Sequence, residues 1–210
     1  MDLRKARLLE LLLQHAFQYR ENPPFVLTSG RTSPYYIDCK PLMLSAEGQT
    51  LMGALGYEAA RRLGVLAVGG LTLGADPFAC AIAHHSFARA HTLQAFVVRK
   101  EAKGHGIARW IEGAVAAGTR VAVIDDVLTT GRSTLQAIER AREAGLVVDC
   151  AIPLIDREEG GREALLAAGV ETHALISRTE LMAARAVASR HVMEMTSDSD
   201  ITPTVAAAAG

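Results

Sequence analysis

Residues 120–134 read RVAVIDDVLTTGRST, an apolar run followed by two adjacent aspartates and then a turn rich in Thr, Gly and Ser. The continuous β-branched character of residues 121–124 predicts a strand that is buried on both faces of a parallel sheet. The spacing of apolar residues in 136–144 predicts a helix. The stretch therefore predicts a strand, a loop and a helix in succession.

The turn between this strand and this helix predicts a phosphate site. Residues 129–133 wrap the helix start, where unpaired backbone N–H groups and the helix dipole favour an anion. Asp125 and Asp126 fall at the carboxyl end of the strand, where open α/β sheets bind ligands, and can accept hydrogen bonds from sugar hydroxyls. The same pattern also occurs in proteins that bind nothing there, so by itself it leaves a structural role open. Two other phosphate motifs are excluded, because the chain has neither G-x-x-x-x-G-K-[ST] nor a G-x-G-x-x-G after the first strand.

The composition predicts a cytoplasmic enzyme. A chain of 210 residues suits one domain with a full core, and 22 basic against 23 acidic residues give no bias toward nucleic acid. We expect no membrane partner either, since no apolar run approaches the ~20 residues of a membrane span. The 3 cysteines are widely separated and lack ligand spacing, which predicts buried thiols and neither disulfides nor a zinc site.

The rest of the chain predicts an α/β fold with a mostly parallel central sheet flanked by helices. We expect one domain over residues 1–195, a small N-terminal hood over about 1–42 that includes a hairpin at 25–39, and a disordered tail over 196–210. The adjacent Tyr35 and Tyr36 should point to opposite faces of a strand. Further strands are expected at 65–71, 93–98, 147–155 and 171–176, and further helices at 3–17, 45–62, 78–87, 161–168 and 179–190.

A basic, glycine-punctuated loop follows the strand at 93–98. Residues 99–107 read RKEAKGHGI, and a charge run of this kind is by default a solvated loop. The alternative is a cationic lid over polyphosphate. The position of residues 99–107 favours the lid. The loop follows the carboxyl end of a predicted strand of the central sheet, as the aspartate pair does.

Residues 121–134 resemble the phosphoribosyl-diphosphate (PRPP) motif of type I phosphoribosyltransferases, which is four apolar residues followed by D-D-x-x-T-x-G. Three further stretches resemble the orotate phosphoribosyltransferase branch of that family, in family order: FVLTSGRTSPYYIDC at 25–39, RKEAKGHG at 99–106 with its continuation at 111–113, and LIDREEGG at 154–161. The basic loop distinguishes the orotate branch from the purine phosphoribosyltransferases, since the latter resemble this chain mainly in the PRPP motif. The resemblance implies the type I fold, transfer of ribose 5-phosphate from PRPP to orotate, Mg²⁺ held mainly through PRPP and not by the protein alone, and a homodimer whose subunits share lid residues.

The resemblance also implies roles for individual residues. The residues implied in catalysis are Lys103, His105, Asp125 and Asp126. The positions implied in PRPP binding are Arg99, Lys100, Lys103, His105, Asp125, Asp126, Val127, Leu128, Thr129, Thr130, Gly131, Arg132 and Ser133. Orotate contacts are implied for Thr129, Arg157, Tyr35 and Tyr36, and a planar, always charged guanidinium suits the carboxylate of orotate.

Two positions depart from the family pattern. Thr28 and Gly74 stand where many members carry lysines that lie near pyrophosphate. Either the Thr28 hydroxyl and the backbone N–H groups of the turns replace those amines, or PRPP binds more weakly to this chain. Two rival functions also remain open at this level: a phosphoribosyltransferase for another base, and a non-catalytic PRPP-binding regulator. A regulator should carry a nucleic-acid-binding module or a basic surface, and neither is visible in the sequence.

Overall fold

The computed structural model describes residues 2–26, 32–101 and 110–198, with side chains up to residue 190. The helices are α1 (Leu3–His15), α2 (Lys40–Met43), α3 (Ala46–Leu63), α4 (Asp76–Phe87), α5 (Arg132–Glu143), α6 (Gly161–Ala167) and α7 (Arg178–Asp198). The strands are β1 (Phe17–Tyr19), β2 (Phe25–Val26), β3 (Thr32–Ser33), β4 (Tyr35–Ile37), β5 (Ala67–Leu71), β6 (Gln94–Val98), β7 (Ile111–Glu112), β8 (Arg120–Leu128), β9 (Val147–Asp156), β10 (Glu171–Thr172) and β11 (Ile176–Ser177).

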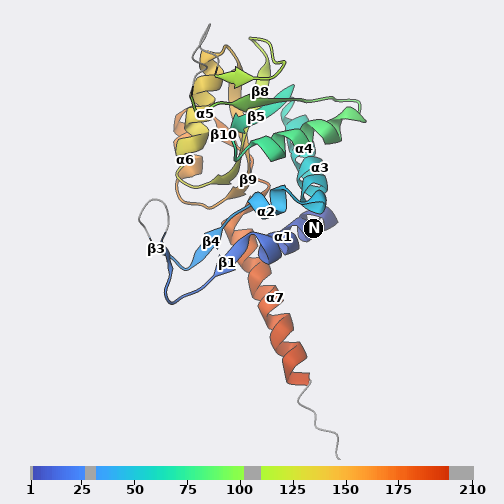
Figure 1. Cartoon of the computed structure of the whole chain (residues 1–210), viewed down its shortest axis with the longest axis vertical. Helices are drawn as coiled ribbons and strands as arrows, with labels where there is room; N and C mark the ends of the chain where they lie inside the picture. The colour runs from blue at the N-terminus through green and yellow to red at the C-terminus, as the bar shows by residue number, and fades with distance from the viewer. Residues whose placement is uncertain (1, 27–31, 102–109, 199–210) are drawn as a thin grey trace, which may run out of the picture.

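The central sheet has the order β10-β9-β8-β5-β6-β7, and β11 also pairs with β9. All of its pairings are parallel except that of β7 with β6. Helices α3 and α4 cover one face, and α5 and α6 cover the other (Figure 1). Along β8, Ala122 and Ile124 belong to the core on the α3 side, whereas Val121 and Val123 belong to the core on the α5 side. The predicted fold class is therefore confirmed, and the strand at 121–124 is buried on both faces.

The strand that carries the aspartate pair is longer than predicted. It continues to Leu128, because the residues after Ile124 stay in register with β9, with Asp125 opposite Pro153 and Leu128 opposite Asp156. Helix α5 begins earlier than predicted, at Arg132, so the polar turn itself forms its first turn. The short antiparallel strand β7 was not predicted, and the expected strand at 171–176 is divided into β10 and β11.

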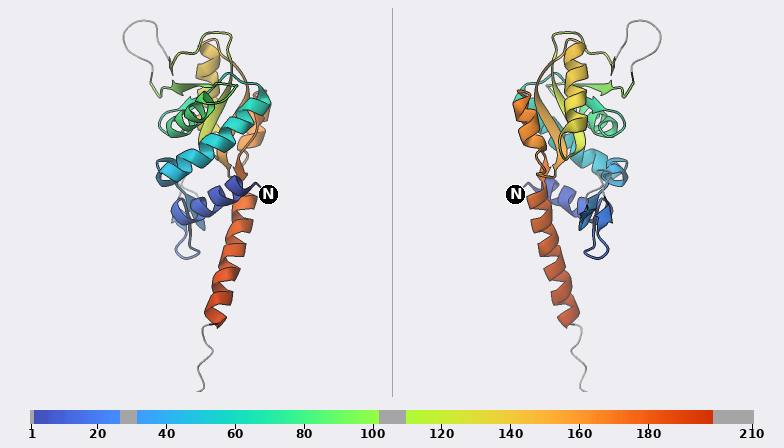
Figure 2. Two further views of the ribbon diagram at one scale, coloured as in Figure 1. Left: turned by 90° about the vertical axis from the view of Figure 1, so that its right-hand side faces the viewer. Right: turned by 90° about the vertical axis from the view of Figure 1, so that its left-hand side faces the viewer.

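The N-terminal region packs below the sheet (Figures 1 and 2). Asp2 caps α1, its side chain accepting from the N–H of Arg4 at 2.9 Å. The expected hairpin is only partly right, because β2 pairs with β3 while β4 pairs with β1. Ion pairs from Arg7 to Glu47 and from Lys5 to Glu180, at 2.7 and 2.6 Å, connect α1 to α3 and α7.

Helix α7 extends away from the body (Figure 2). It runs to Asp198, beyond its predicted end at residue 190, and residues 199–210 of the expected tail lie outside the described residues. The cysteine prediction also needs a correction. All three thiols are free, but only Cys39 and Cys150 are buried, while Cys80 is exposed because it lies on the outer face of α4.

Candidate active site

The site lies where the strand order changes direction. The chain passes from β5 to β6 on one side, and then returns to the other side of β5 to form β8. The loops that leave the carboxyl ends of β5 and β8 consequently diverge, and open α/β sheets bind ligands in such crevices. Asp125 and Asp126 lie there on β8, as predicted, in the last four residues of the strand.

Asp125 braces the start of α5. Its side chain is buried, with 5% of the residue exposed. Its Oδ2 accepts hydrogen bonds from the hydroxyls of Ser133, at 3.0 Å, and Thr134, at 2.7 Å. Burial, reinforced by the neighbouring charge of Asp126, raises the pKa of Asp125 to about 7, against the opposing effect of the two hydroxyl hydrogen bonds. Asp125 therefore joins strand to helix and is poised to exchange a proton near neutral pH.

This shift predicts that the ligand-free fold becomes less stable as pH rises. Folded Asp125 retains a proton that the unfolded chain releases, so its stabilising contribution is complete below pH ~4 and is lost between pH ~4 and ~7. The loss is at most about 4 kcal/mol. We expect the Tm of the wild type to fall from pH 5 to pH 8 more steeply than that of Asp125→Asn, in thermal denaturation at four pH values. Parallel curves for the two proteins would contradict the shift.

Asp126 faces the loop after β5. Its Oδ1 accepts from the N–H of Val127 at 2.9 Å, and a Cβ built on Gly74 would lie 3.0 Å from the same oxygen. Glycine thus lets the β5 loop approach the carboxylate closely. Sequence reasoning missed Lys40, whose pKa is raised mainly by its hydrogen bond to Asp38 and to a lesser degree by the charge of Asp126. The available signal was that Lys40 follows closely after Tyr36 and Asp38, in a stretch already predicted to lie beside the base, so a cation near the aspartate pair could have been expected.

The predicted phosphate loop forms the N-terminus of α5. Gly131 precedes the helix with φ 82°, a left-handed conformation that favours glycine, and no side chain among the described residues caps the helix. The first N–H groups of α5 are therefore available to an anion. A hollow of about 810 Å³ adjoins them, with Thr129, Thr130, Arg132 and Ser133 in its lining. Of the other positions predicted for this ligand, Val127 packs against one core, and Leu128 is fully buried in the other.

The loop after β9 packs against this phosphate loop. A Cβ built on Gly161 would lie 2.5 Å from the carbonyl oxygen of Thr129 and 2.7 Å from Cγ of Leu128. Gly160 has φ 94°, again in the left-handed region. The Gly-Gly pair in LIDREEGG thus has a physical reason, because it lets α6 begin in contact with the turn that precedes α5.

Arg157 lies beside the phosphate loop and under the hood. Its N–H donates to the carbonyl of Leu128 at 2.9 Å, and its guanidinium carbon lies 4.9 Å from the ring centre of Tyr35. The residue is 6% exposed. Its Nη2 forms an ion pair with Glu159 at 2.7 Å without meeting hydrogen-bond geometry, and its Nε is buried with no hydrogen-bond partner among the described residues. Buried polar groups are normally hydrogen-bonded, so the unsatisfied N–H donors of this guanidinium indicate a site for a second anion besides Glu159.

The structure brings together some of the residues predicted to contact the base, but not all of them. Tyr35 and Tyr36 point to opposite faces of β4 as predicted, 8% and 39% exposed respectively. Tyr35 meets Arg157, whereas Tyr36 stacks on Phe25 with ring centres 5.8 Å apart. Thr129 lies at the adjacent strand end, half-buried.

The basic loop is described only at its ends. Arg99 is half-buried and pairs with Glu112 at 3.0 Å, and Lys100 is exposed. The predicted catalytic residues Lys103 and His105 lie outside the described residues, and so does Thr28. In the part of the chain that the structure describes, no group of three His, Cys, Asp or Glu side chains is placed to hold a metal ion.

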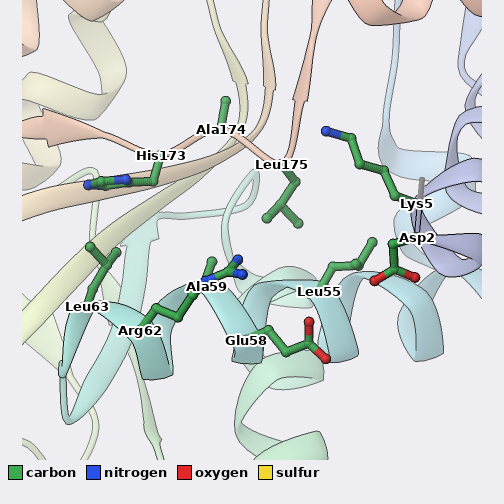
Figure 3. A pocket seen from close by; sticks show the side chains of 10 residues that line it. All are labelled: Asp2, Lys5, Leu55, Glu58, Ala59, Arg62, Leu63, His173, Ala174 and Leu175. Carbon is green, nitrogen blue, oxygen red and sulfur yellow. The ribbon is translucent and has the colours of Figure 1, made fainter.

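A second hollow, of about 570 Å³, lies between α1, α3 and the connection from β10 to β11 (Figure 3). None of the strand-end residues described above lines it. Its charged groups have both signs, and at least three of them are already paired: Asp2 and Glu58 with Arg4, and Lys5 with Glu180. It is therefore separate from the site at the switch point.

Comparisons with known proteins agree with this geometry. A scan against models of protein families finds no match. The orotate phosphoribosyltransferase of Aquifex aeolicus is 43% identical over 180 residues, which cover 86% of this chain and 98% of that protein. The crystal structure of the Mycobacterium tuberculosis H37Rv orotate phosphoribosyltransferase superposes with a TM-score of 0.74 at 37% identity, covering 85% of this chain and 98% of the other. A second structure of the M. tuberculosis enzyme, in complex with PRPP, has a TM-score of 0.71 at 34% identity, with the same coverage. None of the described helices is both long and apolar enough to span a membrane.

Proposed function

This chain belongs to the orotate phosphoribosyltransferase family, and from that premise we propose how its residues carry out the family's reaction. The enzyme is a pentosyltransferase that moves the ribose 5-phosphate group of PRPP to orotate, giving orotidine 5′-monophosphate and pyrophosphate for pyrimidine synthesis. One observation supports the placement of the site above all. An acidic pair, an uncapped helix N-terminus and a buried arginine with unused donors converge at a single switch point.

PRPP is held by the phosphate loop and the acidic pair. We place its 5′-phosphate at the N-terminus of α5, where Thr129–Ser133 of the turn surround it, and its ribose hydroxyls against Asp125 and Asp126. Asp125 reaches the ribose only through Oδ1, since Oδ2 accepts from Ser133 and Thr134. Oδ1 already accepts from the N–H of Asp126 at 3.1 Å, so it would share its lone pairs with a sugar hydroxyl. Asp126 is the more accessible of the two and therefore the main hydroxyl acceptor.

Orotate binds beside Arg157. Its carboxylate suits the edge of the guanidinium formed by Nε and Nη2, which make no hydrogen bond to the described residues. The ion pair of Nη2 with Glu159 and the ring of Tyr35 hold the guanidinium in place. Tyr35 contributes this support and an aromatic face, while Tyr36 contributes at the rim of the site. The base nitrogen of orotate is then directed at the anomeric carbon of PRPP.

Replacing Arg157 by Lys should raise the KM for orotate about tenfold, because a lysine ammonium cannot bind a carboxylate through two parallel hydrogen bonds. The KM for PRPP should change much less. Steady-state kinetics with each substrate varied in turn measure both values. Arg162→Lys is the matched control, since Arg162 lies close by in the first turn of α6 but pairs with Asp156 at 3.2 Å. Equal effects of the two variants on orotate KM would contradict the assignment.

The charged groups of the site accelerate the transfer by stabilising its transition state. As orotate attacks, positive charge develops on the ribose and negative charge grows on the leaving pyrophosphate, so carboxylates near the ribose and cations near the diphosphate both stabilise the transition state. Mg²⁺ would be held mainly through PRPP and, when bound, would add positive charge beside the leaving group. Asp125 and Asp126 fit such a site, since carboxylate oxygens are ligands that magnesium prefers. Arg99, Lys100, Lys103 and His105 supply the remaining cations, and we assign them electrostatic roles ahead of proton transfer.

The enzyme acts as a homodimer in which the basic loop serves the neighbouring subunit. Leu73, which is 73% exposed in the loop after β5, supports a covered apolar surface at the same edge of the sheet as the base of that loop. The free thiols support a reducing compartment, which is the cytoplasm.

A panel of bases tests the substrate. With PRPP and Mg²⁺ present, the purified protein should release pyrophosphate with orotate and not with adenine, guanine, hypoxanthine or uracil. Uracil is the sharpest comparison, because it lacks only the carboxylate that Arg157 is proposed to bind. Comparable turnover with uracil would remove that role, and turnover with a purine alone would overturn the choice of base.

A further inference from the structure

Arg140 of α5 connects the two ends of the basic loop. Its Nη1 donates to the carbonyl oxygen of Arg99 at 2.6 Å, and its guanidinium carbon lies 4.2 Å from the ring centre of Trp110. Arg99 and Trp110 flank the segment that carries Lys103 and His105 in the sequence. They also contact each other, since the N–H of Arg99 donates to the carbonyl of Trp110 at 2.9 Å.

The strands at this point give the two ends little other support. Strand β7 consists of Ile111 and Glu112, and its ladder with β6 joins only these residues to Val98 and Val97. A two-residue ladder at the edge of a sheet is weak. The ion pair between Arg99 and Glu112 is partly exposed, so it adds little. Arg140 is half-buried and makes two contacts at once, an arrangement that suits a planar guanidinium better than an ammonium.

Helix α5 also carries the phosphate loop. Ser133 in its first turn bonds Asp125 at 3.0 Å, and Arg140 follows two turns later, roughly 10 Å along the axis at 1.5 Å per residue. The phosphate loop and the ends of the basic loop are thus attached to one rigid helix.

We propose that Arg140 is a positioning residue for transfer: it holds Arg99 and Trp110, the two ends of the basic loop, against α5, so that the loop leaves its own subunit in a fixed direction toward the phosphate loop of the neighbouring subunit. This inference rests on the proposed function. It adds a residue that does not itself touch substrate and that no motif of the sequence indicated.

Tryptophan fluorescence and kinetics test it together, because Trp110 is the single tryptophan of the chain. Arg140→Leu should shift the emission maximum of Trp110 and lower kcat about tenfold, while the KM for orotate stays within about twofold. Arg142→Leu is the matched control. Arg142 lies on the same helix and also donates to backbone carbonyls, those of Val148 at 2.7 Å and Ala168 at 3.1 Å, but it contacts neither end of the basic loop. This control should change neither the emission nor kcat.

Arg140→Lys keeps the charge and a donor for the Arg99 carbonyl but loses the planar face that lies over Trp110. It should therefore lose less turnover than Arg140→Leu, and it provides a second variant should Arg140→Leu fail to fold. A kcat within twofold of wild type in the folded Arg140 variants, or an equal loss in Arg142→Leu, would overturn the proposal. Failure of the proposed function is distinguishable, because the wild type would then form no orotidine monophosphate while the emission shift remained measurable.

Discussion

Asp126→Asn is expected to lower kcat/KM for PRPP about a hundredfold, the loss typical of removing one charged group that stabilises a transition state. Asp126 is only partly buried, and one of its oxygens is held by the N–H of Val127 at 2.9 Å. Asn can keep that hydrogen bond and the shape of the side chain. The variant therefore removes the negative charge beside the developing positive charge of the ribose and leaves the backbone in place.

The matched control is Asp149→Asn. Asp149 lies on the neighbouring strand β9, is partly exposed, and pairs with Arg120 at 2.8 Å at the start of β8, the opposite end of the sheet from the site. An exposed ion pair of this kind contributes little to stability, so kcat/KM should stay within about twofold. Thermal denaturation and steady-state kinetics on both variants separate charge loss at the site from general damage. If Asp126→Asn retained most of its activity, the acidic pair would not be the ribose site.

Lys103→Ala is expected to reduce kcat about a hundredfold with little change in Tm, because it removes a cation from the leaving pyrophosphate. Lys103→Arg, which keeps the charge, should recover a large part of the loss. Lys5→Ala is the control for removing a lysine elsewhere, since Lys5 of α1 is paired with Glu180 of α7 and does not belong to the basic loop. Unchanged turnover in Lys103→Ala would remove the basic loop from the mechanism.

Lys103→Ala and Asp126→Asn together test whether each active site contains residues of both subunits. If the basic loop serves the neighbouring subunit, a dimer of one Lys103→Ala and one Asp126→Asn subunit contains one site with both defects and one with neither. Random mixing of the two inactive proteins should then restore about a quarter of wild-type activity, since half of the dimers are mixed. No recovery after subunit exchange, with mixed dimers demonstrated by mass spectrometry, would place the loop over its own subunit's site.

Much of the fold and of the PRPP site could be predicted because their signals are local. The apolar run at residues 121–124, the acidic pair and the Thr/Gly/Ser turn are consecutive, and each has one conformational consequence. The side-chain caps that Asp2 and Ser45 provide for α1 and α3 depend on similarly local signals. The opposite orientations of Tyr35 and Tyr36 follow from the alternation of any strand.

The remainder depends on pairings between distant residues. Nothing near residues 17–19 or 35–37 indicates that these strands pair with each other, and the two residues of β7 are too few for a pattern. The roles of Gly161 against Thr129 and of Arg140 against Arg99 and Trp110 appear only when helices from separate parts of the chain pack together. Lys40 was missed for the same reason, since its relation to Asp126 spans the hood and the sheet.

The central claim is that the switch point of this sheet binds PRPP and delivers its ribose to orotate. The loss of orotate absorbance tests it most directly, with purified full-length protein, PRPP and Mg²⁺. We predict a decrease that requires PRPP, proceeds with equimolar pyrophosphate release and is abolished by EDTA. Protein that binds PRPP in calorimetry but leaves the orotate absorbance unchanged would contradict the account.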